Sequence, residues 1–311
     1  MKTNQDVLSI LDFSSKDIRE LLAIAKVLKH MEMWGQSPKP LLDKTGILIF
    51  KKPSLRTRAS FAIGLMQLGA NAITFHDFEI QIGKRETPED AAQVLSRYGD
   101  VIIMRTYSQK EIEDIAKSAT VPVINALTDL LHPCQVLSDA FTILEAKGKL
   151  EGIKVAYLGD GNNVAHSLLN LSSRVPIDLR IAYPVGYAPI DGIVEFAKKA
   201  GVSKITLTND PIEAVNDADV IYTDVWASMG KKEELAERKL QMQPFQINSS
   251  LVKYAAPDYV FMHCLPAERS NEVTSDIIDS KHSIVFDQAE NRLHMQKAIL
   301  CYIFQANIEV E

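Results

Sequence analysis

Hydrophobic positions near the start of the chain recur at helical spacing. After Ser14 the apolar residues of this repeat are Ile18, Leu21, Leu22, Ala25 and Leu28. Ser14 followed by Asp17 is typical of a capping box, which satisfies free backbone N–H groups of a first helical turn. The chain is therefore predicted to open with a long amphipathic helix.

Short apolar runs typical of strands then alternate with helical segments. The first series of predicted strands is Gly46 to Phe50, Ala72 to Phe75, Val101 to Arg105 and Val121 to Asn125. The second series is Ile153 to Leu158, Leu179 to Tyr183, Ile205 to Thr208, Val220 to Thr223, Tyr259 to His263 and Ser283 to Phe286. Such alternation is typical of parallel sheets with helices on their faces.

A polar stretch from Glu145 to Gly152 separates the two series, and 311 residues exceed the usual size of one hydrophobic core. We therefore predict an α/β protein of two domains, each a mainly parallel sheet flanked by helices, with the active site in the cleft between them. The first domain comprises residues 1–145, completed by a C-terminal helix within 289–311. The second comprises residues 150–288.

Composition excludes several classes of protein. The net charge is -6, and the 34 basic residues are interspersed among 40 acidic ones, so we expect no nucleic-acid partner. Residues 1–11 lack the features of a secretory signal, and no apolar run approaches the roughly 20 residues that span a bilayer. We therefore expect a cytoplasmic protein with no membrane partner. The three cysteines, Cys134, Cys264 and Cys301, fit reduced thiols better than a disulfide framework.

The segment from Lys51 to Arg58 joins a predicted strand to a predicted helix and contains two hydroxyls and two guanidiniums. The free N–H groups and the positive dipole end of a first helical turn favour an anion, and Ser54, Arg56 and Arg58 add directed donors. This pattern indicates a phosphate site. The alternative is a set of solvated charges, with Ser54 as an ordinary helix cap.

Polar residues also follow several predicted strands. They are Arg105, Asn125, Asp224 and the pair His263-Cys264. Ligands of open parallel sheets bind beyond the carboxyl ends of the strands, so these side chains are predicted to line the site.

Two further segments precede predicted helices. In His132-Pro133-Cys134-Gln135, the imidazole can donate to a carbonyl oxygen and Gln135 can accept from an amide, although His132 also fits a structural role. The turn Gly159 to Asn163 resembles a dinucleotide-binding turn, but Tyr183 stands where a nicotinamide site needs a carboxylate. Asn163 suits a substrate carboxylate or a helix cap equally.

The segment Asp224 to Gly230 offers an acid, a hydroxyl and free amides, which suit an α-amino acid, or else forms a surface turn. Cys264 fits a thiol or thiolate near a substrate amine, or an inert buried cysteine. With His132, Cys134 and His263 it also supplies the ligand types of a structural zinc, but the adjacent pairing of His263 and Cys264 argues against a metal site.

Together these motifs resemble the aspartate and ornithine carbamoyltransferase family. The resemblance covers nearly the whole chain in order and spacing, and its last motif is Glu290 to His294. Ser228-Met229-Gly230 and His263-Cys264-Leu265-Pro266 resemble the ornithine branch. The family implies attack of the δ-amine of L-ornithine on carbamoyl phosphate, giving L-citrulline and phosphate, with no metal or organic cofactor.

The resemblance implies a role for each motif residue. For carbamoyl phosphate it implies Ser54, the Leu55 amide, Arg56, Thr57, Arg105, His132, Gln135, the Leu265 carbonyl and Arg292, with Gln81 reaching the site of a neighbouring subunit. For ornithine it implies Asn163, Asp224, Ser228 and the Met229 amide, and the catalytic residues are Cys264, Asp224, His132 and Arg105. Members of the family are trimers or multiples of trimers, so we expect a homotrimer.

The chain departs from the family pattern at two positions. Lys51 stands where the family usually has Glu, and Leu55 stands where it usually has Thr. The first change reverses a charge and the second removes a phosphate donor. We therefore predict weaker carbamoyl phosphate binding or a shifted pH optimum.

Other functions fit part of the pattern. The amine acceptor could be putrescine or a modified ornithine, although putrescine would leave the carboxylate-binding donors unpaired. The protein could also be a non-catalytic binding paralogue, or a nucleotide-linked oxidoreductase, which Tyr183 disfavours.

Overall fold

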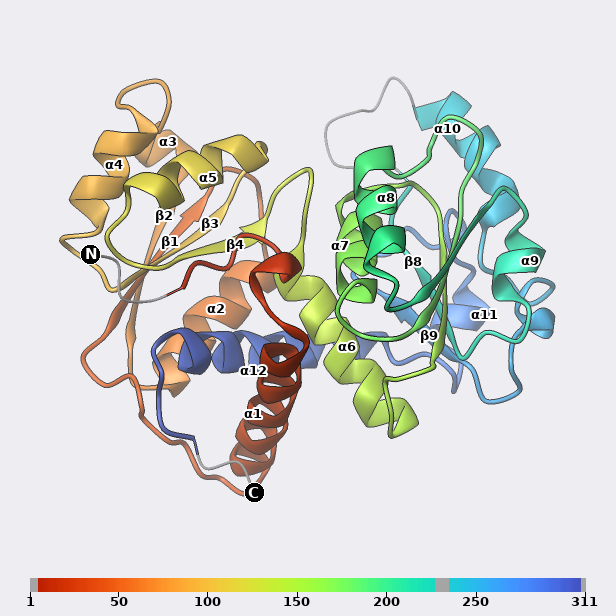
Figure 1. Ribbon diagram of the computed structural model, residues 1–311, viewed down its shortest axis with the longest axis horizontal. Coiled ribbons are helices and arrows are strands. Elements are labelled where there is room, and N and C mark those ends of the chain that lie inside the picture. Colours follow the sequence, from red (N-terminus) through yellow and green to blue (C-terminus); the bar gives the residue numbers. More distant parts are fainter. Residues whose placement is uncertain (1–4, 227–234, 309–311) are drawn as a thin grey trace. The chain divides into compact units, whose positions relative to one another are not determined.

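The computed structural model describes residues 5–226 and 235–308. The chain divides into two compact units, which are Met1–Phe141 with Glu290–Glu311, and Thr142–Ala289. The divisions fall inside two helices, α6 (Pro133–Lys147) and α12 (Val285–Ile303), which are labelled in Figure 1. Each of these helices therefore contributes residues to both units.

The first unit contains a parallel sheet with the order β2-β1-β3-β4. Its strands are β1 (Thr45–Phe50), β2 (Asn71–His76), β3 (Val101–Arg105) and β4 (Val123–Leu127). Ile47 and Ile49 point to the face covered by α4 (Pro88–Leu95) and α5 (Gln109–Ser118). The other face carries α2 (Arg56–Gln67), which approaches so closely that a Cβ on Gly46 would lie 2.4 Å from Leu65 Cδ1.

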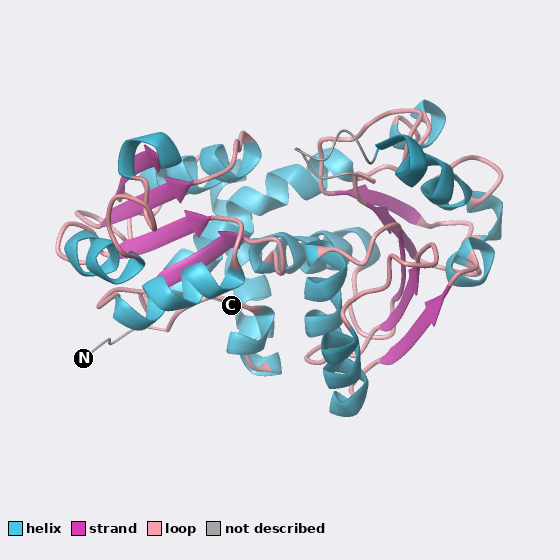
Figure 2. Ribbon diagram, turned by 90° about the horizontal axis from the view of Figure 1, so that it is seen from above, coloured by secondary structure: helices cyan, strands magenta, loops and turns pink. Residues whose placement is uncertain are grey.

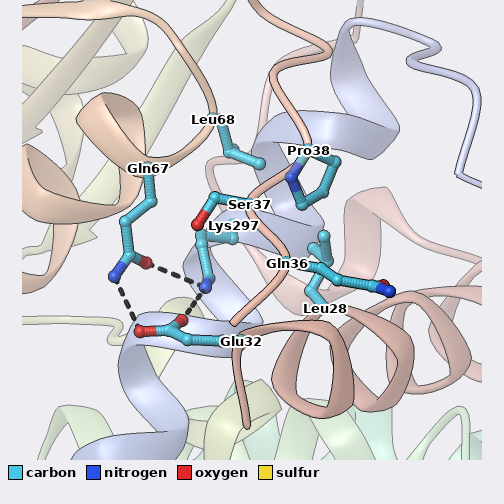
Figure 3. Close-up of a pocket in the computed structure, with 8 residues that line it drawn as sticks. All are labelled: Leu28, Glu32, Gln36, Ser37, Pro38, Gln67, Leu68 and Lys297. Atoms are coloured by element: carbon cyan, nitrogen blue, oxygen red, sulfur yellow. Dashed lines mark hydrogen bonds and ion pairs between the residues drawn. The ribbon is translucent and has the colours of Figure 1, made fainter. Parts of the chain in front are cut away.

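Three helices of the first unit are joined by a buried lysine. The helix α1 (Ser15–Met33) begins with the predicted Ser14 and Asp17 capping box. Figure 3 shows Lys297 of α12 donating to Glu32 of α1 and to Gln67 of α2, and the Lys297 Nζ to Gln67 Oε1 distance is 2.9 Å. Burial alone would raise the pKa of Glu32, but the contact with Lys297 outweighs it and lowers that pKa. The short elements η1 (Ile10–Asp12) and α3 (Asp77–Ile80) complete the unit.

The second unit contains a parallel sheet with the order β7-β6-β5-β8-β9. Strands are drawn in magenta in Figure 2. Its strands are β5 (Lys154–Leu158), β6 (Asp178–Ala182), β7 (Lys204–Thr208), β8 (Val220–Thr223) and β9 (Val260–His263). Ala156, Ile221 and Phe261 pack with α9 (Pro211–Val215) and α11 (Ser275–Ile278). The other helical elements are α7 (Asn163–Ser172), α8 (Asp191–Ala200), α10 (Leu235–Met242), η2 (Gln243–Phe245) and η3 (Val252–Tyr254).

The structure confirms two α/β domains with parallel sheets and flanking helices. The predicted strand from Ser283 to Phe286 is wrong, because Ser283 makes only an isolated bridge to Phe261 and α12 begins at Val285. Val285 is buried whereas Phe286 is 73 % exposed, so these two apolar residues lie on different sides of the first turn of α12. A run this short has no periodicity that separates a helix from a strand.

Candidate active site

The polar motif residues gather at the point in each parallel sheet where the order of the strands reverses. In the first unit, β1 pairs with β2 on one side and with β3 on the other, and Phe50 is in register with Arg105. In the second, β5 pairs with β6 and β8, and Leu158 is in register with Thr223. Such switch points, at the carboxyl ends of the strands, are where open α/β sheets bind ligands. Each unit therefore has one site of the expected kind.

In the first unit, two guanidinium groups converge on one hydroxyl. Arg292 Nη2 lies 2.6 Å from Thr57 Oγ1, and Arg105 Nη1 lies 3.4 Å from the same oxygen and 3.4 Å from Ser54 Oγ. Thr57 and Arg292 are buried, being 1 % and 3 % exposed. Like charges held this close repel each other, and a bound anion relieves that repulsion. The arrangement therefore favours an anionic ligand.

The start of α2 lies beside these groups. Leu55 is the N-cap residue, and no side chain caps the helix there. The backbone N–H groups of the first turn are thus open to an anion. Ser54 accepts from Arg105 instead of capping the helix, and Arg56 is half-buried at its first position. Arg58 is exposed and contacts His76, so it lies apart from this cluster.

His132 and Gln135 lie at the start of α6 and are both buried. Burial, followed by the positive charges of Arg292 and Arg105, lowers the pKa of His132 well below its usual value. The imidazole is therefore neutral near pH 7 and donates through one ring nitrogen only. Gln135 Nε2 donates to Asp139 at 2.9 Å, and among the described residues its buried Oε1 has no hydrogen-bond partner. That oxygen can accept from a ligand amide.

Gln81 lies at the C-cap of α3, with an exposed side chain and a left-handed backbone (φ 46°, ψ 46°). Within the described ranges, no hydrogen bond joins its side chain to the Arg105 and Arg292 cluster.

In the second unit, Asp224 and Cys264 meet at the ends of β8 and β9. Cys264 Sγ donates to Asp224 Oδ1 at 2.9 Å, and Asn162 Nδ2 donates to Asp224 Oδ2 at 2.8 Å. The register of Thr223 with His263 brings the two following residues side by side. A carboxylate held between a thiol and an amide is suited to a substrate amine.

Asn162, rather than the neighbouring Asn163, is the N-cap of α7 and contacts Asp224. Its side chain caps α7 by accepting from the Val164 and Ala165 amides, in addition to its bond with Asp224. Asn163 is the first residue of α7 and is half-buried. A polar residue directly before a helical run is the usual signal of an N-cap, so the sequence contained the information.

A second missed contact secures the turn after β5. Arg238 of α10 pairs with Asp160 and with the Trp226 carbonyl, and its guanidinium lies 4.8 Å from the centre of the Tyr187 ring. The partners are distant in sequence, so no local pattern indicated them. The predicted ligands Ser228 and Met229 lie outside the described residues.

Two of the residues weighed as zinc ligands, His263 and Cys134, are engaged in other interactions. His263 Nδ1 accepts from the Leu265 amide at 2.8 Å, and its Nε2 donates to buried Glu272 at 3.1 Å, so both ring nitrogens are occupied. Leu265 itself has a left-handed φ of 57°. Burial raises the pKa of Cys134 to about 12, so it is a thiol, which donates to the Asn125 carbonyl.

Asn125 is a structural residue. It lies inside β4, because this strand continues to Leu127, and its amide donates to the Leu8 carbonyl and to Gln109. The expectation that it lines the site is therefore wrong.

Comparisons with known proteins match two family models, one to each half of the chain. Residues 5–145 match the family model described as aspartate/ornithine carbamoyltransferase, carbamoyl-P binding domain. Residues 151–303 match the model described as aspartate/ornithine carbamoyltransferase, Asp/Orn binding domain. No helix in the described ranges is long and apolar enough to cross a membrane.

Curated relatives and solved structures are similar over almost their whole length. The chain is 49 % identical to the anabolic ornithine carbamoyltransferase of Pyrococcus furiosus, covering 96 % of each chain. It is 51 % identical to the ornithine carbamoyltransferase of Bacillus subtilis, covering 95 % of this chain and 92 % of that one. A solved structure of the enzyme from Pyrococcus furiosus has a TM-score of 0.94 at 48 % identity, covering 98 % of each chain.

Proposed function

The chain belongs to the aspartate/ornithine carbamoyltransferase family, and from this premise we propose that it transfers the carbamoyl group of carbamoyl phosphate to the δ-amine of L-ornithine. The products are L-citrulline and phosphate. The relatives compared above are named for ornithine as the acceptor.

The convergence of Arg105 and Arg292 on Thr57 at the start of α2 is the observation that carries this proposal. The leaving phosphate has about two negative charges near pH 7, as a phosphate monoester does. Guanidinium and helix-start N–H donors stabilise that charge as it grows on the departing oxygen.

Other residues of the first unit orient the carbamoyl group. Neutral His132 donates to the carbonyl oxygen, and the buried Gln135 Oε1 accepts from the carbamoyl NH2. The phosphate is bound by Ser54, the Leu55 amide, Arg56, Thr57, Arg105 and Arg292, and the Leu265 carbonyl adds a further contact to the carbamoyl group. Gln81 contributes to the site of a neighbouring subunit.

The second unit binds the amino acid. Asp224 accepts from the ornithine amines and Cys264 faces the δ-amine, in keeping with their 2.9 Å contact. Asn163 and the Met229 amide bind the carboxylate, and Ser228 assists at the α-amine. A free alkylamine has a pKa near ~10.4, so at neutral pH only about one molecule in a thousand is uncharged and nucleophilic. The positive charge of the phosphate site favours that form, and holding both substrates in line supplies further rate.

The proposed domains are residues 1–145 with 289–311 for carbamoyl phosphate, and 150–288 for ornithine. We also propose a homotrimer in the cytoplasm. Exposed apolar side chains of the first unit support assembly, and they include Ile63 and Met66 of α2, Ile73 of the edge strand β2, and Phe78 of α3.

A substrate panel tests the proposal. Purified protein is incubated at fixed carbamoyl phosphate with ornithine, putrescine, aspartate or N-acetylornithine, and ureido products and phosphate are measured. We expect turnover with ornithine alone. Turnover with putrescine would assign the rival acceptor, and no turnover with any amine would leave a binding paralogue.

A further inference from the structure

Lys51, which directly follows β1, lies at the centre of a mostly buried polar cluster. Its Nζ donates to the Ile82 carbonyl at 2.7 Å and to the Glu111 carboxylate, and it lies 3.9 Å from Asp77 Oδ1. The Lys51 and Glu111 side chains are only 11 % and 17 % exposed. Glu111 also accepts from the Thr106 hydroxyl. We call Lys51, Thr106, Glu111 and the Ile82 carbonyl the Lys51 cluster.

The Lys51 cluster contacts the backbone at Arg105 and the side chain of the next residue, Thr106. The Lys51 backbone N–H donates to the Arg105 carbonyl at 2.9 Å, and Thr106 is the next residue along. The backbone of Arg105 is therefore held on one side by Lys51 itself and on the other through Thr106 and Glu111. Arg105 is one of the two guanidiniums that converge on Thr57.

The cluster also anchors the turn that follows α3. Ile82 is buried in the core that includes α4 and α5, and its carbonyl is bound by Lys51. The preceding Gln81 is in the left-handed region, which costs free energy in a residue other than glycine unless the surroundings fix it. A further bond, from the Gly83 amide to the Glu86 carbonyl at 2.8 Å, closes the turn. Lys51 thus links β1, β3, α5 and this turn.

We propose that Lys51 is a positioning residue for the anion site: its ammonium, paired with Glu111, fixes both the Arg105 end of β3 and the Gln81 turn. This inference rests on the proposed function of the first unit. The charge of Lys51 acts on Glu111 and Ile82 rather than on the phosphate. The departure from the family's usual Glu is therefore compensated within the chain.

Removing the ammonium takes one donor away from the half-buried Glu111 carboxylate and one from the carbonyl of buried Ile82. Glu111 keeps only the Thr106 hydroxyl, and the Ile82 carbonyl loses its donor. Uncompensated groups of this kind drive local rearrangement, here at the Gln81 turn and the end of β3. A merely stabilising ion pair would instead lower overall stability and leave the anion site unchanged.

The test compares Lys51→Met, Lys51→Arg and the matched control Lys44→Met. Lys44 pairs with Asp100 at 2.9 Å at the opposite end of β1, so it controls for loss of an ion pair on the same strand. Three quantities are measured: hydrogen exchange of the amides in residues 79–86, the Michaelis constants for each substrate, and the melting temperature. Glu111→Gln replaces Lys51→Met if that variant is insoluble.

For Lys51→Met we expect exchange in residues 79–86 and the KM for carbamoyl phosphate each to rise about tenfold, with the KM for ornithine within about twofold of wild type. Lys51→Arg should keep hydrogen exchange in residues 79–86 and the KM for carbamoyl phosphate close to their wild-type values. Lys44→Met should change neither quantity. A Lys51→Met variant that behaves like Lys44→Met would overturn the proposal. Faster exchange with an unchanged KM would overturn it equally, because Lys51 would then be only structural.

Failure of the proposed function is distinguishable from failure of this inference. If the wild-type protein shows no turnover with ornithine, the dissociation constant of carbamoyl phosphate, measured by calorimetry, replaces KM. A rise of about tenfold in Lys51→Met alone supports the positioning role, and equal constants in both methionine variants reject it.

Discussion

His132 is the residue at which burial and function are most closely connected. The pKa of its imidazole is lowered in the folded protein by burial and by two guanidiniums, whereas in the unfolded chain it is near ~6.5. Above that pH both states are neutral, and below it only the unfolded chain takes up a proton. Stability is therefore fully present above about pH 6.5 and falls as the pH drops, by up to about 1.4 kcal/mol per pH unit.

Urea unfolding at pH 7.5, 6.5 and 5.5 measures this effect. In His132→Asn the free energy of unfolding should decrease less between pH 7.5 and pH 5.5 than in wild type. In His30→Asn, at an exposed position on α1, it should decrease as much as in wild type. Identical pH slopes in wild type and His132→Asn would contradict the buried neutral imidazole.

Leu55 offers a direct test of the departure from the family pattern. It is the N-cap of α2, is 73 % exposed and makes no side-chain cap. Leu55→Thr adds a hydroxyl that caps the helix and donates to phosphate, worth about 1 kcal/mol in each role. We expect a KM for carbamoyl phosphate about threefold to tenfold lower and a higher melting temperature. Leu55→Val, which has the branched shape without the hydroxyl, should show neither gain.

The expected effect of replacing Lys51 by Glu differs from the expectation based on the sequence alone. The sequence suggested that restoring Glu there would strengthen carbamoyl phosphate binding. Because the ammonium pairs with Glu111 and lies near Asp77, Lys51→Glu would place like charges together and is now expected to weaken it.

Residue identities at strand ends were predictable, but their partners were not. Arg105, Asp224 and Cys264 follow from the rule for parallel sheets. The pairs of Lys51 with Glu111 and of Arg238 with Asp160 join residues far apart in the chain, and local hydrophobic patterns contain no information about them.

Among the elements, the turn between β5 and α7 is the most tightly constrained. A Cβ on Gly161 would lie 2.2 Å from the Pro189 backbone nitrogen and 2.4 Å from the Ala188 backbone carbon, so the clash is with backbone rather than with a flexible side chain. Gly161→Ala should therefore destabilise the protein by about 2 kcal/mol, in the range of overpacking, and should raise the KM for ornithine more than that for carbamoyl phosphate.

Gly192→Ala in α8 is the matched control for this turn. Nothing lies within 4 Å of a Cβ there, and α8 includes this residue. The substitution should be neutral or stabilising by about 0.5–1 kcal/mol, as measured by urea unfolding. Gly161→Ala with wild-type stability and kinetics would show that the turn is not constrained as described.

The elements themselves were predictable where they are long or strongly periodic. The first helix follows its capping box and its apolar stripe. The error at Ser283 to Phe286 and the early end assigned to β4 both occur where a few apolar residues decide the assignment. Short elements such as α3, α10 and α11 depend on tertiary packing and had no signal of their own.

For the whole molecule, the proposed trimer depends on the exposed apolar side chains of the first unit. Met66 and Ile73 are 56 % and 47 % exposed, and β2 is an edge strand. Met66→Lys with Ile73→Lys should convert the trimer to monomers, detected by light scattering during gel filtration. Activity should fall at least about tenfold if Gln81 acts in a neighbouring subunit.

The control for assembly lies in the second unit. Phe196→Lys with Ile212→Lys changes side chains of similar exposure, 44 % and 43 %. This variant should keep the trimer mass. A trimer that survives the Met66 and Ile73 changes would place the contact surface elsewhere.

The return of α12 to the first unit has a consequence for synthesis on the ribosome. Arg292 and the core residues Met295, Ala298 and Ile299 belong to a unit whose other residues emerge first. The nascent chain therefore cannot complete its earliest unit until α12 has been translated, whereas the intervening unit is finished sooner. A transcript that stops short of codon 290 would direct synthesis of a product with an open core and only one of its two converging guanidiniums.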